Sequence, residues 1–156
     1  MSALRLGLIS DTHNLLRPEA ADALRGVDAI LHLGDICKVE ILDQLAQIAP
    51  VTAIRGNNDQ GDWAQTLPEQ LQLELLGYRL FLIHDLKQMD LSPVQSGFDI
   101  VLSGHSHKPS VNRNQGILYC NPGSAGPRRF KLPITVGYLH LSKAGAQAEI
   151  VELALG

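Results

Sequence analysis

The sequence predicts an α/β fold that occupies residues 1–156 as a single domain. In the first sixty residues, apolar runs of strand length alternate with segments of helical periodicity, which is typical of parallel strands joined by helices. In the remainder, shorter apolar runs are separated by Gly, Pro and Asn, which indicates antiparallel pairing. A length of 156 residues suffices for one buried core and is too short for two domains of ordinary size.

The first half is predicted to contain three strands and two helices. Apolar runs that stop abruptly at polar residues predict strands at 4–9, 27–33 and 51–54. Helical spacing predicts helices at 18–24 and 39–49, the first opening at a proline and the second followed by one. Because parallel strands place their carboxyl ends at one edge of a sheet, the polar residues that follow these strands are expected to converge.

The second half is predicted to consist mainly of strands. Alternating residues at 71–75 and 79–83, with a tight turn at Gly77-Tyr78, predict a β-hairpin. Further apolar runs predict strands at 99–103, 117–120, 134–141 and 146–153. We expect the last three of these to form an antiparallel second sheet.

Polar side chains of the types that bind metal ions follow five of the predicted strands. In chain order they are Asp11-Thr12-His13, Gly34-Asp35, Gly56-Asn57-Asn58-Asp59, His84-Asp85 and Gly104-His105-Ser106-His107. If the chain stays extended after the first strand, Asp11 and His13 point the same way and can share one ion. Each motif alone is compatible with an ordinary loop or helix cap, but five in succession favour a shared site. A mixed set of oxygen and imidazole ligands suits a transition-type ion better than Ca²⁺.

These motifs, with Asn121-Pro122-Gly123-Ser124 and Pro127-Arg128 behind them, resemble the calcineurin-like metallophosphoesterase superfamily. The resemblance is to its small bacterial and archaeal phosphodiesterases, which are also similar to the retromer subunit Vps29, and it runs from Ile9 to about Arg129. It implies a two-sheet β-sandwich flanked by helices, with metals at the strand tips.

The same resemblance implies two divalent ions and their ligands. One ion is assigned to Asp11, His13, Asp35 and His107, and the other to Asp35, Asn57, His84 and His105. Asp35 bridges the two ions, and the residues expected to be catalytic are Asp35, Asn57 and His105. Mn²⁺ is the expected metal, with Ni²⁺, Fe, Zn²⁺ and Mg²⁺ as alternatives.

Such a site predicts a reaction class. Two ions about 3.5–4 Å apart acidify a water between them and clamp a phosphoryl group for in-line attack. We therefore expect a dinuclear-metal-dependent phosphodiesterase that attacks a small phosphodiester with a metal-bridging hydroxide. The alternative from a different class is a Vps29-like metal-binding scaffold with little or no catalysis, which would not need to retain His13, His105 and His107 together. A phosphomonoesterase or protein phosphatase is a third hypothesis.

Two departures from the family pattern bear on the substrate. Asn58 stands where the phosphomonoesterases of the superfamily usually have a histidine that protonates the leaving group, so we expect poor turnover of monoesters. Asp85-Leu86 stands where relatives generally have Gly-His. A phosphate-facing donor is thereby lost at Leu86, and Asp85 places a negative charge near an anionic substrate.

Other polar residues have structural interpretations. His32 and His140 lie within apolar strands and are expected to be structurally satisfied, and Asp59 is expected to orient the Asn57 loop by hydrogen bonding. Cys37 and Cys120 are expected to be reduced thiols. Gly123-Ser124 is expected to support the cleft by backbone contacts. Two alternatives stay open for each of two other features: Arg128-Arg129 as ester ligands or plain loop residues, and Trp63 as a core residue or part of a substrate or dimer surface.

Composition constrains the partners and the location. The net charge is −3 with histidine neutral, and no basic cluster exceeds Arg128-Arg129, so no nucleic-acid surface is expected. The N-terminus lacks the features of a signal peptide and no run reaches the length of a membrane span, so we expect a cytoplasmic protein. By analogy with relatives, a homodimer or homotetramer is expected.

Overall fold

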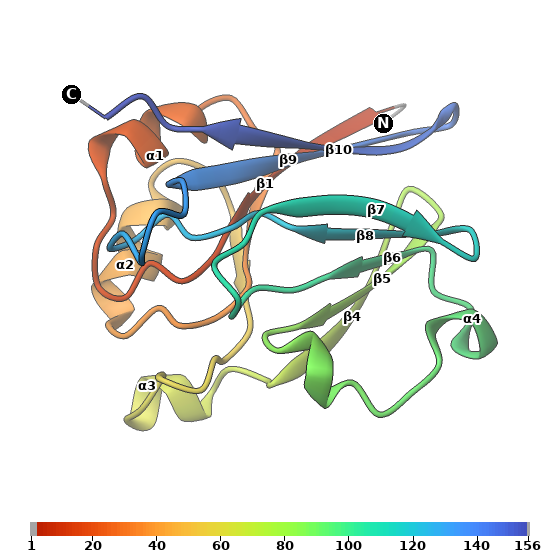
Figure 1. Ribbon diagram of the computed structural model, residues 1–156, viewed down its shortest axis with the longest axis horizontal. Helices are drawn as coiled ribbons and strands as arrows, with labels where there is room; N and C mark the ends of the chain where they lie inside the picture. Colours follow the sequence, from red (N-terminus) through yellow and green to blue (C-terminus); the bar gives the residue numbers. More distant parts are fainter. Residues whose placement is uncertain (1–2, 156) are drawn as a thin grey trace.

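The strand and helix alternation of the first half builds one side of the molecule. In the computed structural model, which describes residues 3–155, strands β1 (Ala3–Ile9), β2 (Ala29–His32) and β3 (Val51–Ala53) are parallel neighbours, as predicted. The crossovers are α1 (Pro18–Ala23) and α2 (Val39–Ala46), which Figure 1 shows beside these strands. All three strands therefore end at the same edge of the sheet.

The two C-terminal strands complete this first sheet, sheet A. Strands β9 (Thr135–Ser142) and β10 (Gly145–Glu152) pair antiparallel, and β9 also pairs antiparallel with β1, so the strand order is β10-β9-β1-β2-β3. The prediction that these runs form a second sheet is therefore wrong. The physical reason is that β1 would otherwise be an edge strand, and β9 satisfies its free backbone groups.

The second sheet, sheet B, is mixed rather than antiparallel. Its order is β4 (Gln70–Leu75), β5 (Tyr78–Ile83), β6 (Ile100–Leu102), β8 (Ile117–Asn121) and β7 (Ser110–Asn114). The hairpin β4-β5 is present as predicted, but its turn residues are Leu76 and Gly77, both at positive φ, because Tyr78 already pairs with Leu75. Because β5, β6 and β8 are parallel, their carboxyl ends also share one edge.

Several short elements have no counterpart in the prediction. They are β7, α3 (Asp62–Gln65), the 3₁₀ helix η1 (Leu86–Gln88) and α4 (Pro93–Ser96). All five residues of β7 are exposed, so the strand lacks apolar alternation, and the three helices are too short to show a helical period. Among residues 3–155, no helix is both long and apolar enough to cross a membrane.

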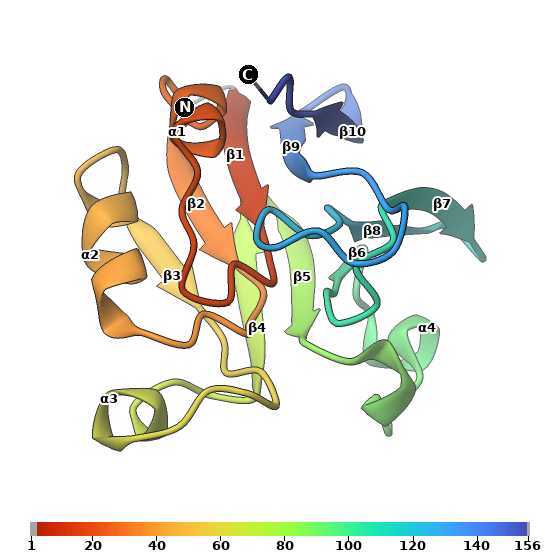
Figure 2. The same cartoon turned by 60° about the vertical axis from the view of Figure 1, so that its left-hand side comes forward.

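Of the three apolar clusters in the described residues, two flank sheet A. One lies between the sheets and includes Leu6 and Leu8 of β1, Leu80 and Leu82 of β5, and Leu139 of β9. The other lies between sheet A and its helices, which Figure 2 shows on the outer side of β2 and β3. Trp63 packs against this second layer, which favours the core interpretation of that residue. The rigid sheets thus fix the position of the loops at their ends.

Candidate metal centre

The loops that follow the parallel strands of both sheets meet in one place. Asp35 follows β2 in sheet A, and its Oδ2 lies 3.3 Å from Nε2 of His84, which follows β5 in sheet B. Oδ1 of Asp11, after β1, lies 3.8 Å from the same His84 nitrogen and 3.6 Å from Nε2 of His107. His84 and His107 therefore face one carboxylate oxygen rather than separate surfaces.

Within this site the side chains form two adjoining groups of ligand atoms. In each group the ligand atoms lie within 4.8 Å of one another, and the groups are Asp11, His13 and His107, and Asp35, His84 and His105. Nε2 of His13 lies 3.8 Å from Oδ1 of Asp11 and 3.7 Å from Oδ2 of Asp35, so the groups touch. Six of the seven predicted metal ligands thus come together as two sets.

Asn57, the seventh predicted ligand, lies at the open side of the second group. It is exposed, and its Oδ1 is 3.2 Å from Nδ1 of His105. His105 is also the most open of the four predicted histidine ligands, with 44% of its side chain exposed. Asn57 and His105 therefore line the mouth of the site, while Asp11 and Asp35 form its floor.

The backbone of the site is left-handed, in contrast to the predicted extended path. Asp11, His13, Asp35, His105 and His107 have φ values of 56°, 46°, 60°, 72° and 63°. The loop after β1 turns because its backbone is hydrogen-bonded to the loop after β2, with the amide of Asp11 donating to the carbonyl of Gly34 and that of His13 to the carbonyl of Asp35. Asp11 and His13 still converge, but through this turn and not through strand periodicity. Such conformations cost of order 1–3 kcal/mol each and concentrate at functional sites.

Buried ligand atoms of this site fit a cation because they have no hydrogen-bond partner among the described residues. Oδ1 of Asp11, Nε2 of His13 and Nε2 of His84 have no hydrogen-bond partner among residues 3–155. Nδ1 of His84 lies 2.7 Å from the carbonyl of Leu33 and donates to it, so in the neutral ring Nε2 carries the free lone pair and faces Asp35. Unpartnered buried acceptors are costly, and a divalent ion satisfies them without supplying a proton.

The two carboxylates have different electrostatic environments. Burial acts to raise the pKa of Asp35, but the approach of His84 and a hydrogen bond from the Asn58 amide outweigh it, so the pKa is lowered below the usual range. Burial raises the pKa of Asp11, against the opposing charge of His84. Asp35 is therefore held as an anion between the two groups.

Asn58 contributes to the site in a way that the sequence did not indicate. Its backbone amide donates to Oδ1 of Asp35 over 2.9 Å, and its side-chain Nδ2 donates to Oδ2 over 3.0 Å. Ser10 plays a similar part for Asp11, because its hydroxyl donates to Oδ2 over 2.7 Å. Their adjacency to a motif residue is the only sequence signal that marks these two supports.

Asp59 orients the loops, as predicted. Its Oδ2 accepts the backbone amides of Asp35 (2.9 Å) and Gly56 (2.8 Å), and its Oδ1 accepts those of Ile36 (2.7 Å) and Cys37 (2.8 Å). One buried carboxylate therefore ties the loop after β2 to the loop after β3. It has no capacity left for a metal.

The Gly123-Ser124 segment supports the cleft through contacts with the backbone, as predicted. The hydroxyl of Ser124 donates to the carbonyl of Asp11 over 3.1 Å, and the amide of Ala125 donates to the carbonyl of Ser10 over 3.1 Å. Gly123 has a φ of 78°, and a Cβ there would lie 2.1 Å from Oγ1 of Thr135. The segment therefore holds the loop after β1 from behind.

His32 is structurally satisfied, as predicted. The amide of Gly34 donates to its Nδ1 over 3.1 Å, so its Nε2 donates to the hydroxyl of Thr12, 3.0 Å away. Burial lowers the pKa of His32 to about 3, so the ring is neutral. His140 is less enclosed, with 44% of its side chain exposed, and its Nε2 lies 3.4 Å from Oε1 of Glu149.

The two cysteines are free thiols. Burial raises the pKa of Cys37 to about 11 and that of Cys120 to about 12, so neither is a reactive thiolate at neutral pH. The sulfur of Cys37 is 3.6 Å from Nδ1 of His13, where it steadies the imidazole ring. Arg128 and Arg129 are exposed, and the Arg128 guanidinium donates to the carbonyl of Leu132.

A cavity of about 530 Å³ opens beside the second group of ligand atoms. It is bordered by His84 and His105 and extends along the residues around the start of β4 and the end of β5. Asp85 lies at its wall, with Oδ2 3.7 Å from Nε2 of His105. The sequence did not indicate this cavity, because its lining comes from residues that are distant along the chain.

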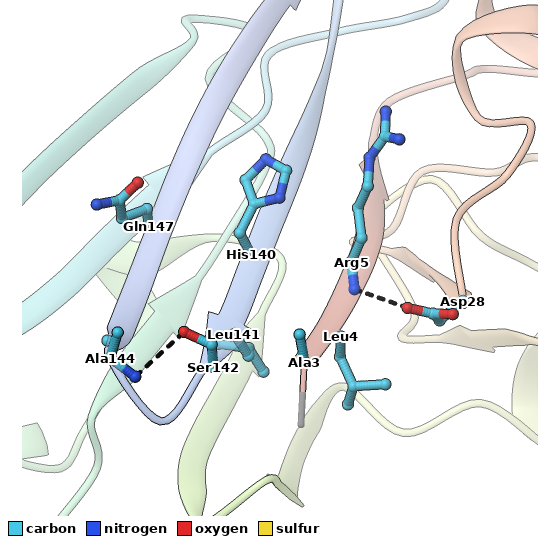
Figure 3. Close-up of a pocket in the computed structure, with 10 residues that line it drawn as sticks. Ala3, Leu4, Arg5, Asp28, His140, Leu141, Ser142, Ala144 and Gln147 are labelled. Atoms are coloured by element: carbon cyan, nitrogen blue, oxygen red, sulfur yellow. Dashed lines mark hydrogen bonds between the residues drawn. The ribbon is translucent and has the colours of Figure 1, made fainter. Parts of the chain in front are cut away.

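A second hollow lies along β1, β9 and the start of β10 in sheet A, and none of the predicted metal ligands lines it. Its volume is about 360 Å³, and Figure 3 shows Arg5, Asp28, His140 and Gln147 around it. Asp28 is already engaged there, because it accepts the backbone amide of Arg5 over 2.8 Å. This hollow therefore gives no reason to place the predicted metal centre in it.

Comparison with known proteins identifies the class to which this fold and site belong. Residues 4–144 match the family model for the calcineurin-like phosphoesterase superfamily domain. A probable metallophosphoesterase of Methanothermobacter thermautotrophicus is 35% identical over 94% of this chain and 91% of its own length. A phosphodiesterase of Methanocaldococcus jannaschii is 25% identical over 96% of this chain and 100% of its own length.

Solved structures agree on the fold. Vps29 of Cryptosporidium parvum superposes with a TM-score of 0.78 at 18% identity, covering 99% of this chain and 100% of that one. An archaeal phosphodiesterase gives a TM-score of 0.78 at 23% identity, covering 95% and 100%. The chain belongs to the calcineurin-like metallophosphoesterase superfamily.

Proposed function

We propose that this protein is a phosphodiesterase that depends on two divalent metal ions. The observation that carries the proposal is the pair of Asp/His groups, whose buried acceptor atoms lack partners within the described chain. In this proposal one ion is held by Asp11, His13, Asp35 and His107, and the other by Asp35, Asn57, His84 and His105. Mn²⁺ is the proposed metal because the donors mix carboxylate, amide and imidazole, and Ni²⁺, Fe, Zn²⁺ and Mg²⁺ are the alternatives.

The proposed role of each residue follows from its position in the site. When bound, the two ions supply an acidified water and charge compensation for in-line displacement at phosphorus. Asp35 is the shared ligand, since its Oδ2 lies 3.7 Å from Nε2 of His13 and 3.3 Å from Nε2 of His84. Asn57 and His105, at the open mouth, face the phosphoryl group and complete the proposed catalytic set with Asp35.

The surroundings favour a diester over a monoester. Asn58, beside Asp35, is an amide and has no proton to give to a leaving group at neutral pH. Asp85, 3.7 Å from His105, adds a negative charge at the mouth and disfavours the second charge of a monoester dianion. The related phosphodiesterase of Methanocaldococcus jannaschii agrees with this choice.

A metal-binding scaffold is the second candidate, and the structural likeness to Vps29 favours it. The Vps29 of Entamoeba histolytica, solved with Zn²⁺, covers 96% of this chain with a TM-score of 0.72 at 22% identity. A likeness at that identity concerns the fold alone. Under this hypothesis the ions stabilise the loops and hydrolysis is absent.

Metal-dependent hydrolysis separates the two candidates. The metal-free protein is assayed with bis(p-nitrophenyl) phosphate and p-nitrophenyl phosphate, alone and after addition of Mn²⁺, Ni²⁺, Zn²⁺ or Mg²⁺. We expect hydrolysis only with metal, and a higher kcat/KM for the diester. No hydrolysis with any of these metals would reject the enzymatic proposal, and a preference for the monoester would reject its specificity.

A substitution of the shared ligand gives a second test. Asp35→Asn removes the carboxylate common to both groups, so we expect kcat/KM to fall at least about a hundredfold while the protein remains folded by circular dichroism. Asp43→Asn, an exposed residue of α2, is the matched control and is expected to keep full activity. A scaffold would lose stability in Asp35→Asn and would have no activity to lose.

A further inference from the structure

The cavity beside His84 and His105 has the size of a ligand site and extends beyond the proposed metal ligands to Arg55, Glu69 and Asp85. At about 530 Å³ it lies within the range of about 300–1,000 Å³ in which proteins bind small molecules. Its lining residues are Arg55, Gly56, Asn57, Asp59, Glu69, Gln70, Ile83, His84, Asp85, Gln88 and His105. No Phe, Tyr or Trp is among them, so the cavity offers no platform for stacking a nucleobase.

The charged residues of the lining leave an excess of negative charge. Three carboxylates, Asp59, Glu69 and Asp85, stand against one guanidinium, that of Arg55, which gives a formal charge of −2. Arg55 is already paired, because its Nη2 donates to Oε1 of Glu69 over 2.6 Å. Arg55 is therefore not a free cation that could receive a further anionic group of a substrate.

Of the three carboxylates, Asp85 is the one that is partly buried and not already paired with a guanidinium or used by several backbone amides. Asp59 accepts four backbone amides, and Glu69 is paired through Oε1 with Arg55 and is 71% exposed. Oδ1 of Asp85 accepts the amide of Lys87, but Oδ2 has only the imidazole of His105 near it, at 3.7 Å. With 23% of its side chain exposed, Asp85 is shielded enough for its charge to act on a ligand in the cavity.

We propose that this cavity binds one ester arm of the phosphodiester substrate, and that this arm is a positively charged amino alcohol. The proposal rests on the phosphodiesterase function and adds the chemical class of the substrate. The phosphoryl group lies at the ligand groups, and the arm extends past His105 toward Asp85. An ammonium group compensates the negative charge of the cavity, whereas an arm with its own anionic group is repelled.

The test compares substrates that differ only in the charge of one arm. Three p-nitrophenyl phosphodiesters carry choline, its uncharged isostere 3,3-dimethylbutanol, or the anionic 2-hydroxyethanesulfonate as the second arm. With the Mn²⁺-loaded protein we expect kcat/KM for the choline diester to exceed that for its neutral isostere about fivefold, and the sulfonate diester to be the poorest substrate. The matching methylphosphonate monoesters, titrated calorimetrically, should show the same order of Kd without turnover.

Variants locate the selectivity in the cavity. Asp85→Asn keeps a side chain that can cap η1 but removes the negative charge. The ratio of kcat/KM for the choline diester over that for its neutral isostere is therefore expected to fall toward one. Glu69→Gln leaves Arg55 without an anionic partner, so kcat/KM for the sulfonate diester should rise relative to that for the neutral diester. Asp90→Asn, an exposed residue outside the cavity, is the matched control and should keep the wild-type ratio.

The outcomes separate this proposal from the function on which it rests. The arm assignment is wrong if the three diesters are hydrolysed equally well and the three methylphosphonates bind equally well, or if the sulfonate compounds are preferred. The protein would then still be a phosphodiesterase. The same holds if Asp85→Asn retains the full choline preference. If no diester is hydrolysed with any metal, the proposed function itself fails, and the order of Kd for the methylphosphonates still decides what the cavity binds.

Discussion

Asn58 shows how a single side chain sets the chemistry of the site. Its two nitrogens hold both oxygens of Asp35, at 2.9 and 3.0 Å, so it positions the proposed shared ligand. An amide does not exchange a proton at neutral pH, so it cannot assist a poor leaving group. The position that would carry a general acid in a phosphomonoesterase is thus used here for orientation.

Replacing this amide by an imidazole should change the substrate preference. In Asn58→His, a protonatable ring would stand beside Asp35, and we expect the ratio of kcat/KM for p-nitrophenyl phosphate over bis(p-nitrophenyl) phosphate to rise at least about tenfold. Asn58→Gln, which keeps an amide, is the control and should not raise the ratio. An unchanged ratio in Asn58→His would contradict the role assigned to this position.

At the residue level the sequence indicated which side chains gather but not how the backbone presents them. Asp11, Asp35 and His84 each follow an apolar run directly or after one residue, so their convergence could be predicted from the end of a strand. The left-handed turn at Asp11 depends on an amide partner in another loop, the carbonyl of Gly34, and no local pattern encodes such a partner. The contact of Cys37 with His13 was missed for the same reason.

Among the secondary-structure elements, the linkage of β2 and β3 through Asp59 is central to the site. Both oxygens of this buried carboxylate accept two backbone amides each, from the loops that carry Asp35 and Asn57. Backbone amides that lose a buried acceptor cannot reach water. The two strands are therefore held in register at their carboxyl ends by one side chain.

Asp59→Asn should loosen this linkage. One acceptor oxygen becomes an NH₂ group that faces backbone donors, so we expect unfolding free energy to fall by about 2–4 kcal/mol, measured by urea denaturation of the metal-free protein. Metal affinity should fall with it, because Asp35 is no longer fixed. Asp62→Asn, an exposed residue of α3, should change stability by no more than about 0.5 kcal/mol. A fully stable Asp59→Asn protein would show that the four hydrogen bonds are dispensable.

Element types were easier to predict than element partners. The parallel strands β1, β2 and β3 and the hairpin β4-β5 could be predicted because their periodicity and turns are local. The pairing of β9 with β1 joins residues more than a hundred positions apart, and nothing in either run specifies it. The polar strand β7 has no apolar face by which to recognise it.

For the molecule as a whole, the two sheets contribute complementary halves of the site. Parallel strands in sheet A supply the carboxylates, and parallel strands in sheet B supply His84, His105 and His107. The family and the sandwich architecture predicted from the motifs are confirmed. The homodimer or homotetramer and the cytoplasmic location stay predictions.

Global stability should depend on pH through His32. Burial lowers the pKa of this ring from 6.5 to about 3. Below pH 6.5 the ring therefore binds a proton in the unfolded chain but not in the folded protein. Stability is therefore complete above pH 6.5 and decreases as the pH falls toward 3, by up to about 1.4 kcal/mol per pH unit. Urea titrations of the metal-free protein between pH 7.5 and 5 measure this slope.

A comparison of variants isolates the contribution of His32. His32→Asn has no ring to protonate, so its stability should depend less steeply on pH than that of the wild type. Gln147→Asn, at an exposed position of β10 in the same sheet, changes no titratable group and is expected to keep the wild-type slope. Equal slopes for wild type and His32→Asn would show that the buried ring does not control acid stability.

The left-handed backbone of the five site residues has a consequence for how ions enter. Such conformations are unfavourable for residues with a Cβ by about 1–2 kcal/mol each, and the folded loops sustain them through their mutual hydrogen bonds. A pocket that is already shaped has little chain entropy to lose when a cation arrives. The free energy of metal coordination therefore contributes to binding affinity and is not spent on ordering the loops. For the same reason, the loops should keep their conformation when one divalent ion replaces another.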